Sequence, residues 1–146
     1  MTSYTLNPVL AKNAGDAREW ALCSHFGIDR TAHDSKSYDK ASDCETAEHN
    51  YSVKASGFTL MSGNLCEGLT DFEGIWRLYS ERVHSDRFVY ITADWTAFEM
   101  DLTEFGIFIH NFCFLERESA KNGGATKIRC RKESSKMVAW LTERAA

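Results

Sequence analysis

The sequence of 146 residues has no long apolar run, and no segment approaches the roughly 18 apolar residues that a membrane-spanning helix requires. Residues 1–6 contain no basic region followed by an apolar stretch, so we expect no secretory signal. The chain also has no glycine-rich phosphate loop, no Gly-x-Ser-x-Gly elbow and no dinucleotide-binding fingerprint. The commonest motifs of nucleotide-binding proteins and serine hydrolases are therefore missing.

The five cysteines are odd in number and include no Cys-x-x-Cys pair. Free thiols in a reducing cytoplasm are the simplest interpretation, and we expect a cytoplasmic protein. A zinc site built from Cys44, His49 and Cys66 with His33 is an alternative. Its spacings match no closed zinc site, because a tight cysteine knuckle is lacking.

The composition is that of an ordinary globular protein, with 43% hydrophobic residues, 26% charged residues and a single proline. A chain of this length fits one domain, residues 1–146, which buries about two-thirds of its unfolded surface. The net charge of −4 argues against a protein that coats nucleic acid without specificity.

The charge is distributed unevenly along the chain. Between 121 and 136 the only acidic residue is Glu133, and the basic residues are Lys121, Lys127, Arg129, Arg131, Lys132 and Lys136. Such a segment can grip a polyanion, or it can be an ordinary solvated face.

Helical spacing of apolar residues predicts four helices. The first opens at Gly15-Asp16 and ends near Phe26, with Gly27 as its stop signal. The other three begin behind capping residues and follow in this order: a helix capped by Thr70 or Asp71 that runs to about Val83, a helix over 104–120 capped by Thr103, and a short helix capped by Ser134 or Ser135.

Runs of β-favouring residues predict five strands, at 39–46, 50–60, 87–93, 96–100 and 126–132, with 96–100 as either the continuation of 87–93 or its hairpin partner. The first two pair as a hairpin. The last alternates apolar and basic residues as an edge strand does, with Ile128 and Cys130 on one face. The resulting order, α-β-β-α-β-β-α-β-α, predicts an α/β fold with a mixed sheet flanked by helices.

A lysine in an otherwise apolar strand is costly to bury, and Lys54 ends the strand segment Tyr51-Ser52-Val53-Lys54. If the two segments pair as a hairpin, Asp43 can lie near Lys54. Asp43 can then ligate Mg²⁺, with the Val53 carbonyl as a further oxygen ligand. Lys54 can stabilise the charge that develops on a phosphate, or lower the pKa of an attacking water. The alternative is a surface ion pair on an edge hairpin.

Glu19 shares a helical stripe with apolar residues of the first predicted helix. The first stripe holds Leu22, Cys23 and Phe26, and a neighbouring stripe holds Trp20, Ala21 and Ser24. Which stripe faces the core stays open. A carboxylate on a core-facing stripe needs a metal or a buried base as partner, whereas a boundary glutamate reaches water.

Three motifs together resemble the PD-(D/E)XK, or restriction-endonuclease-like, nuclease superfamily. They are Gly15-Asp16-x-x-Glu19 on the first predicted helix, Ser42-Asp43, and Tyr51-Ser52-Val53-Lys54. The resemblance covers roughly residues 12–100, where the α-β-β-α-β order is similar too. It implies a fold with a restriction-endonuclease-like core that binds one or two Mg²⁺ ions and hydrolyses phosphodiesters. Glu19 would be the helical acid, Asp43 the metal-binding aspartate and Lys54 the lysine.

Ser52 departs from this pattern, since the family usually has Asp or Glu two residues before the lysine. Some restriction enzymes of the superfamily carry Ser-x-Lys and recruit a glutamate from further along the chain. Glu67, thirteen residues after Lys54, falls at a similar interval. Glu73 is a reserve, and Glu45 is a third candidate on the same strand face as Asp43.

We therefore expect a Mg²⁺- or Mn²⁺-dependent endonuclease that acts on DNA, with Asp43, Glu67 and Val53 as metal ligands. The basic segment would contact phosphate oxygens through Lys127, Arg129, Arg131, Lys132 and Lys136. A homodimer is expected because one active site cuts one strand. The alternative is a catalytically inactive relative that binds nucleic acid or serves as a protein-interaction module.

Overall fold

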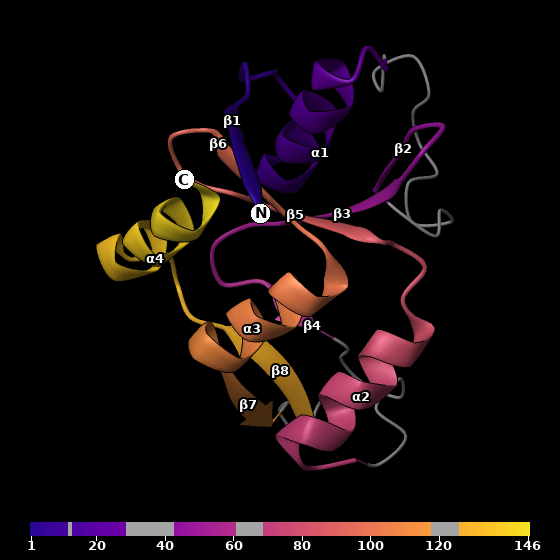
Figure 1. Cartoon of the computed structure of the whole chain (residues 1–146), viewed down its shortest axis with the longest axis vertical. Coiled ribbons are helices and arrows are strands. Elements are labelled where there is room, and N and C mark those ends of the chain that lie inside the picture. The colour runs from indigo at the N-terminus through magenta and orange to yellow at the C-terminus, as the bar shows by residue number, and fades with distance from the viewer. Residues whose placement is uncertain (12, 29–42, 61–68, 118–125) are drawn as a thin grey trace.

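The computed structural model describes residues 1–11, 13–28, 43–60, 69–117 and 126–146. These residues form four helices and eight strands in the order β-α-β-β-β-α-β-β-α-β-β-α (Figure 1). The elements are β1 (Thr2–Thr5), α1 (Ala14–His25), β2 (Cys44–Glu45), β3 (Asn50–Lys54), β4 (Thr59–Leu60), α2 (Phe72–Arg82), β5 (Arg87–Ile91), β6 (Thr96–Met100), α3 (Leu102–Phe112), β7 (Cys113–Arg117), β8 (Thr126–Cys130) and α4 (Ser135–Ala145). No helix in these ranges is both long enough and apolar enough to cross a bilayer.

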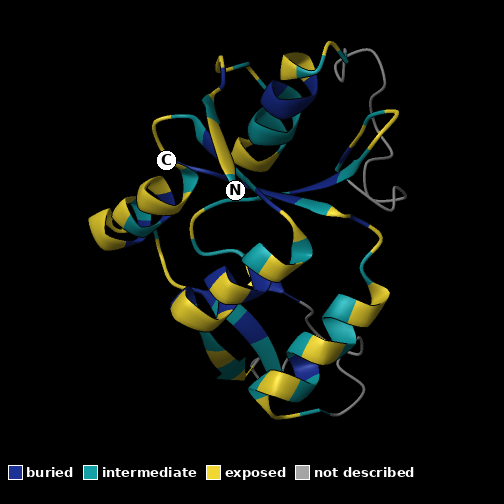
Figure 2. Ribbon diagram, in the orientation of Figure 1, coloured by how far each residue is buried: buried dark blue, intermediate teal, exposed yellow. Residues whose placement is uncertain are grey.

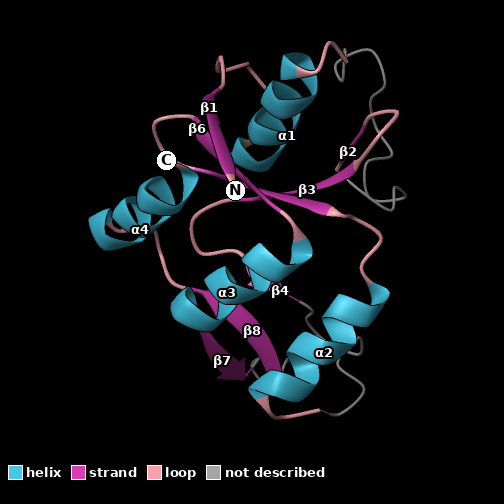
Figure 3. Cartoon of the chain, in the orientation of Figure 1, coloured by secondary structure: helices cyan, strands magenta, loops and turns pink. Residues whose placement is uncertain are grey.

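The strands form two sheets rather than one. A five-stranded sheet has the order β1-β6-β5-β3-β2, and a three-stranded sheet has the order β4-β8-β7 (Figure 3). In the larger sheet β3 and β5 run parallel, and all other neighbours are antiparallel. The predicted mixed α/β fold is therefore confirmed, and the second sheet was not predicted.

At the centre of the five-stranded sheet, β5 is buried on both faces because helices cover each side. Phe88 and Tyr90 of β5 point into one hydrophobic core, and Val89 and Ile91 point into the other. The first core is closed by α2, α3, α4 and the smaller sheet, the second by α1 (Figures 1 and 2). The continuous apolar run of β5 follows from this two-sided burial.

The helices begin close to their predicted positions. Asp71 and Ser134, each one of two predicted caps, are the N-caps of α2 and α4. The cap of α3 is Asp101 rather than Thr103, because Asp101 forms a reciprocal capping box with Glu104. At the end of α1, Gly27 has a φ of +79°, which is the stop expected there.

The third helix is shorter than predicted. It ends at Phe112, Cys113–Arg117 form β7 instead of continuing the helix, and 118–120 lie outside the described residues. Helical spacing continues through Leu115, but residues 113–117 pair along their whole length with β8. Because β4 pairs with the other side of β8, this basic strand is the centre of its sheet, and the predicted edge position was wrong.

The predicted strand 50–60 breaks after Lys54. Residues 59–60 return as β4 and pair with β8 in the smaller sheet. Gly57, with a φ of +70°, lies in the turn between them and allows the change of direction. Of the predicted strand 39–46, residues 44–45 are β2, and 39–42 lie outside the described residues.

Candidate functional site

The hairpin of β2 and β3 brings Asp43 to the edge of the five-stranded sheet, as the sequence predicted. The Asp43 N–H donates to the Tyr51 carbonyl at 2.9 Å, which continues the pairing of the two strands. The Asp43 carboxylate then accepts a hydrogen bond from the Val53 N–H, with 2.7 Å between Oδ2 and N. Asp43 is therefore anchored one residue from Lys54.

The Val53 backbone faces the same edge as Asp43. The N–H and C=O of a strand residue point to the same side of the strand, and the Val53 N–H points to Asp43. The Val53 carbonyl is thus turned toward the side on which the Asp43 carboxylate lies. This orientation suits the oxygen-ligand role that the sequence predicted for Val53, which stays a prediction.

Lys54 points from β3 into the side of the sheet that α2 and α3 cover. Its register partner on β5 is Tyr90, whose ring lies in the core on that side. The Lys54 ammonium lies 5.8 Å from the centre of the Phe58 ring. Burial lowers the pKa of Lys54, while the negative charges of Asp43 and Glu19 oppose that lowering. Asp43 and Glu19 therefore both lie within electrostatic reach of Lys54.

Glu19 reaches this region from α1, on the other side of the sheet. Residues Ala21, Leu22 and Cys23 of α1 are buried and Ser24 is exposed, so the stripe that contains Leu22 and Cys23 faces the core. Glu19 is half-buried at the boundary of that stripe. Ala21 of the neighbouring stripe is buried as well, so the core-facing side of α1 is centred on Leu22 and Cys23 and takes residues from both stripes.

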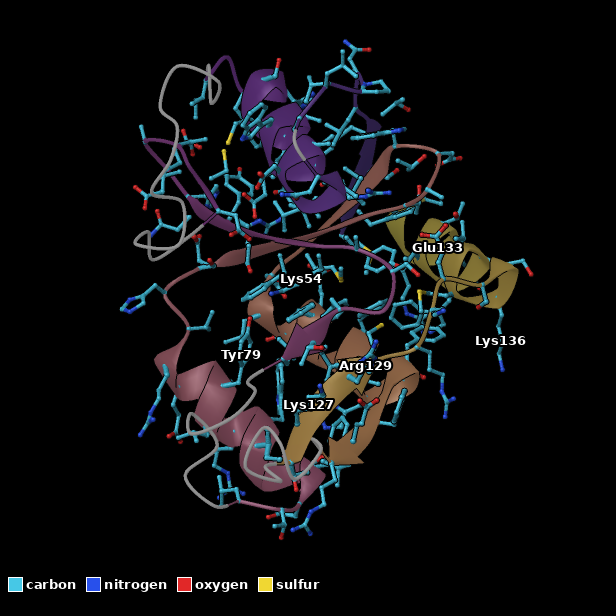
Figure 4. All side chains as sticks on the ribbon, turned by 180° about the vertical axis from the view of Figure 1, so that it is seen from behind. Lys54, Tyr79, Lys127, Arg129, Glu133 and Lys136 are labelled. Carbon is cyan, nitrogen blue, oxygen red and sulfur yellow. The ribbon has the colours of Figure 1, made fainter. Side chains whose placement is uncertain are left out.

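Tyr79 of α2 is a member of the cluster that the sequence did not reveal. Figure 4 shows Tyr79 and Lys54 on the same side of the larger sheet. Burial raises the pKa of Tyr79, a hydrogen bond with Ser52 opposes this, and the charge of Asp43 raises the pKa further. Helical spacing marks Tyr79 only as one more core aromatic, because nothing in the spacing indicates which strand residue its hydroxyl meets.

The donors at this edge suit a hard cation. Mg²⁺ prefers oxygen ligands and is usually held by one or two carboxylates together with water and substrate phosphates. Asp43 and Glu19 supply two carboxylates, and among the described residues no group of three or more His, Cys, Asp or Glu gathers into a metal-holding cluster. Two carboxylates within reach of Lys54 are thus the acidic ligands that the described residues offer such an ion, and water and phosphate would have to complete its coordination.

The three candidates for the acid missing at Ser52 lie in different settings. Glu67 lies outside the described residues. The Glu73 carboxylate contacts His110 of α3, with 2.6 Å between Oε1 and Nε2. Glu45 is exposed on β2.

The residues considered for zinc are also separated. Cys44 is buried in the core beneath α1, and the His49 ring contacts Asp86 at 2.5 Å. Cys66 and His33 lie outside the described residues.

The basic segment divides into two parts. Lys127 and Arg129 lie on the face of β8 opposite the buried Ile128, and both contact Glu116 of β7, at 3.7 Å and 3.4 Å. Three further basic residues are exposed: Arg131, which stacks on Phe114 with 5.1 Å to the ring centre, Lys132 and Lys136. Lys121 lies outside the described residues. Lys136 extends from α4 away from the rest of the molecule (Figure 4).

Comparison of this chain with models of known protein families, with curated proteins and with solved structures finds no match.

Proposed function

We propose that this chain is a metal-dependent endonuclease that hydrolyses DNA phosphodiester bonds at the edge of β3. The observation that carries the proposal is the half-buried Lys54, whose pKa is lowered by desolvation and on which the charges of both Asp43 and Glu19 act. A partly desolvated cation beside two carboxylates is an arrangement that suits phosphoryl chemistry, since the carboxylates can hold a metal while the cation meets the phosphate. Perturbed pKa values of this kind gather at functional sites.

Each residue has a distinct role in the proposed reaction. Asp43 and Glu19 would hold Mg²⁺, with the Val53 carbonyl as a further ligand. The ion would supply Lewis-acid stabilisation of the phosphate and a lower pKa for its bound water. Lys54 would neutralise the charge that develops on the phosphate oxygens. Tyr79, whose pKa is raised by burial, keeps its proton and would donate a hydrogen bond at this site.

The order of elements around the site supports the resemblance in part. The β2–β3 hairpin is followed by the short strand β4, which belongs to the smaller sheet, then by α2 and by β5, which runs parallel to β3. We propose on this basis that residues 43–91 correspond to the central part of a restriction-endonuclease-like core. The proposed enzyme is cytoplasmic and cuts both strands as a homodimer, while the exposed Arg131, Lys132 and Lys136 contact phosphate oxygens.

A second candidate function is an inactive relative that binds nucleic acid without cutting it. It is favoured by the bond between Asp43 Oδ2 and the Val53 N–H, which gives that carboxylate a structural role. Ser52 also supplies no charge where the family has an acid. The two functions differ in one measurable property, cleavage.

Plasmid cleavage in the presence of Mg²⁺ or Mn²⁺ tests the proposal. Lys54→Met keeps the volume of the buried stem, and Asp43→Asn keeps an acceptor for the Val53 N–H. Each is expected to lower the cleavage rate by roughly 100-fold or more, the usual cost of removing one electrostatic stabiliser. Arg77→Met and Glu81→Gln, which replace exposed residues of α2, are matched controls and should cut like the wild type.

Cleavage that survives both site substitutions would refute the assignment of the site. If the wild type binds DNA but cuts it in neither Mg²⁺ nor Mn²⁺, the second candidate function, binding without cleavage, is the correct one.

A further inference from the structure

Cys113 and Cys130 lie directly opposite each other on β7 and β8 of the smaller sheet. The Arg131 N–H donates to the Phe112 carbonyl at 2.9 Å, so the ladder bond joins the residues that flank the cysteines. The Cys130 N–H points the other way and donates to the Phe58 carbonyl at 2.8 Å. The two cysteines therefore form a non-hydrogen-bonded pair, the position at which antiparallel strands bring opposite side chains closest.

This position has the geometry that a disulfide requires. Opposite Cα atoms in a non-hydrogen-bonded pair are about 4.5 Å apart. That distance lies within the range of roughly 4.4–6.8 Å that disulfides span. Opposite residues also point to the same face of the sheet, so both sulfur atoms lie on the side of the first core. The strands do not have to move for the bond to form.

We propose that Cys113 and Cys130 are an oxidative modification site that forms an intramolecular disulfide in response to a hydroperoxide. Cys113 is half-buried, whereas Cys130 is only 1% exposed. Cys113 is therefore the thiol that meets the oxidant, and Cys130 is the thiol that resolves the intermediate.

The chemistry balances in two steps. The Cys113 sulfur attacks one peroxide oxygen and breaks the O–O bond, which gives a sulfenic acid and one molecule of water when the oxidant is hydrogen peroxide. The Cys130 sulfur then attacks the Cys113 sulfur, expels the hydroxyl as a second water and forms the S–S bond. Both thiols are oxidised, the peroxide is reduced, and the two thiol protons end in water.

The rate of this reaction depends on pH. A hydrogen bond with Cys130, together with burial, raises the pKa of the Cys113 thiol. Since the thiolate is the reactive form, oxidation is slow near neutral pH and becomes faster as the pH rises.

The other described cysteines serve as internal controls. Cys23 and Cys44 are 1% and 2% exposed and lie in the other core, beneath α1. If buried thiols were oxidised without selectivity, Cys23 and Cys44 would react as readily as Cys130. If the reaction depends on the opposed Cys113 and Cys130, Cys23 and Cys44 should stay reduced.

The test treats the folded wild type with hydrogen peroxide between pH 7 and pH 9, blocks the remaining thiols after denaturation, and maps a non-reduced digest by mass spectrometry. The expected product has lost two hydrogen atoms and yields one cross-linked peptide pair that contains Cys113 and Cys130. Dithiothreitol should reverse the change. The oxidised protein should melt about 5 °C higher, because the cross-link restricts the unfolded chain.

Cys113→Ser should abolish the cross-linked peptide, and Cys44→Ala should leave it at the wild-type yield. The digest of the wild type decides the question even if a variant does not fold. A cross-link to any other cysteine, or a product in which Cys113 is over-oxidised and Cys130 still accepts the blocking reagent, would overturn the proposal. So would the absence of any reaction over this pH range.

Discussion

At the scale of single residues, two opposing effects act on the pKa of Lys54: desolvation lowers it, and two nearby carboxylates raise it. The residue is half-buried, its ammonium lies 5.8 Å from the centre of the Phe58 ring, and desolvation lowers its pKa. Asp43 and Glu19 return part of the lost stabilisation through their charges. A charge in such a place seldom adds stability, since an apolar residue of similar volume often serves the fold equally well, and the proposed function gives this lysine a chemical role.

The lowered pKa of Lys54 leads to a prediction about stability and pH. Between that lowered pKa and the ordinary value of 10.5, the unfolded chain binds the proton more readily than the folded protein does. Unfolding therefore takes up a proton, and the free energy of unfolding rises with pH in this window. Below it the full cost of burying the charge is present, and above 10.5 that cost is gone.

Urea unfolding of the wild type and of Lys54→Met from pH 7 to pH 10 measures this effect. The free energy of unfolding of the wild type should rise relative to that of the variant as the pH rises. The buried tyrosines are present in both proteins, so their contribution drops out of the difference. A difference between the two proteins that stays constant with pH would show that the Lys54 ammonium is solvated in the folded state.

At the scale of elements, the boundary at Asp101 separates a strand from a helix with no loop between them. β6 ends at Met100, and α3 begins at Leu102. The Asp101 carboxylate accepts from the Glu104 N–H at 2.7 Å, and the Glu104 carboxylate accepts from the Asp101 N–H at 3.0 Å. Thr103 has the right chemistry for a cap, but it lies inside the first turn.

Asp101→Ala should lower the free energy of unfolding by about 1 kcal/mol, the usual cost of losing an N-cap. For a chain of this size the melting temperature should fall by roughly 2–4 °C. Thr103→Ala is the matched control, because it replaces an exposed residue of the same turn with a better helix former, and it should change stability by no more than about 0.5 kcal/mol. Thermal unfolding followed by circular dichroism measures the stability of both variants. A larger loss of unfolding free energy in Thr103→Ala than in Asp101→Ala would contradict this assignment of the cap.

At the scale of the whole molecule, a group of exposed positive charges lies after β8 among the described residues, although the chain as a whole carries a net charge of −4. Lys127 and Arg129 contact Glu116, so their charge is partly neutralised within the sheet. Lys132 and Lys136 are exposed and lie between β8 and the first turn of α4. We expect these two lysines to account for more of any phosphate binding than the strand residues do.

Salt dependence separates the two groups. The double variant Lys132→Gln and Lys136→Gln should weaken DNA binding and flatten the slope of log K against log salt by about 2, since each phosphate contact contributes about 0.9. The double variant Lys127→Gln and Arg129→Gln should change the slope less. Fluorescence anisotropy with a short duplex measures both, and an unchanged slope in the first variant would remove these lysines from the interface.

The sequence by itself determined the local features of this protein. Caps at Asp71 and Ser134, the stop at Gly27 and the β5–β6 hairpin all follow from interactions between residues a few positions apart. The pairing of β2 with β3 is equally local, and with it the approach of Asp43 to Val53 and Lys54.

Only the tertiary structure decided the features that depend on distant segments. Residues 113–117 continue a helical pattern but become β7, because β8 offers a complete set of backbone partners. Thr59–Leu60 leave the larger sheet for the same strand. Tyr79 joins the cluster at Ser52 and Lys54 only because α2 packs against β3. Periodicity describes one element at a time, so it cannot specify which distant strand or helix supplies the partner.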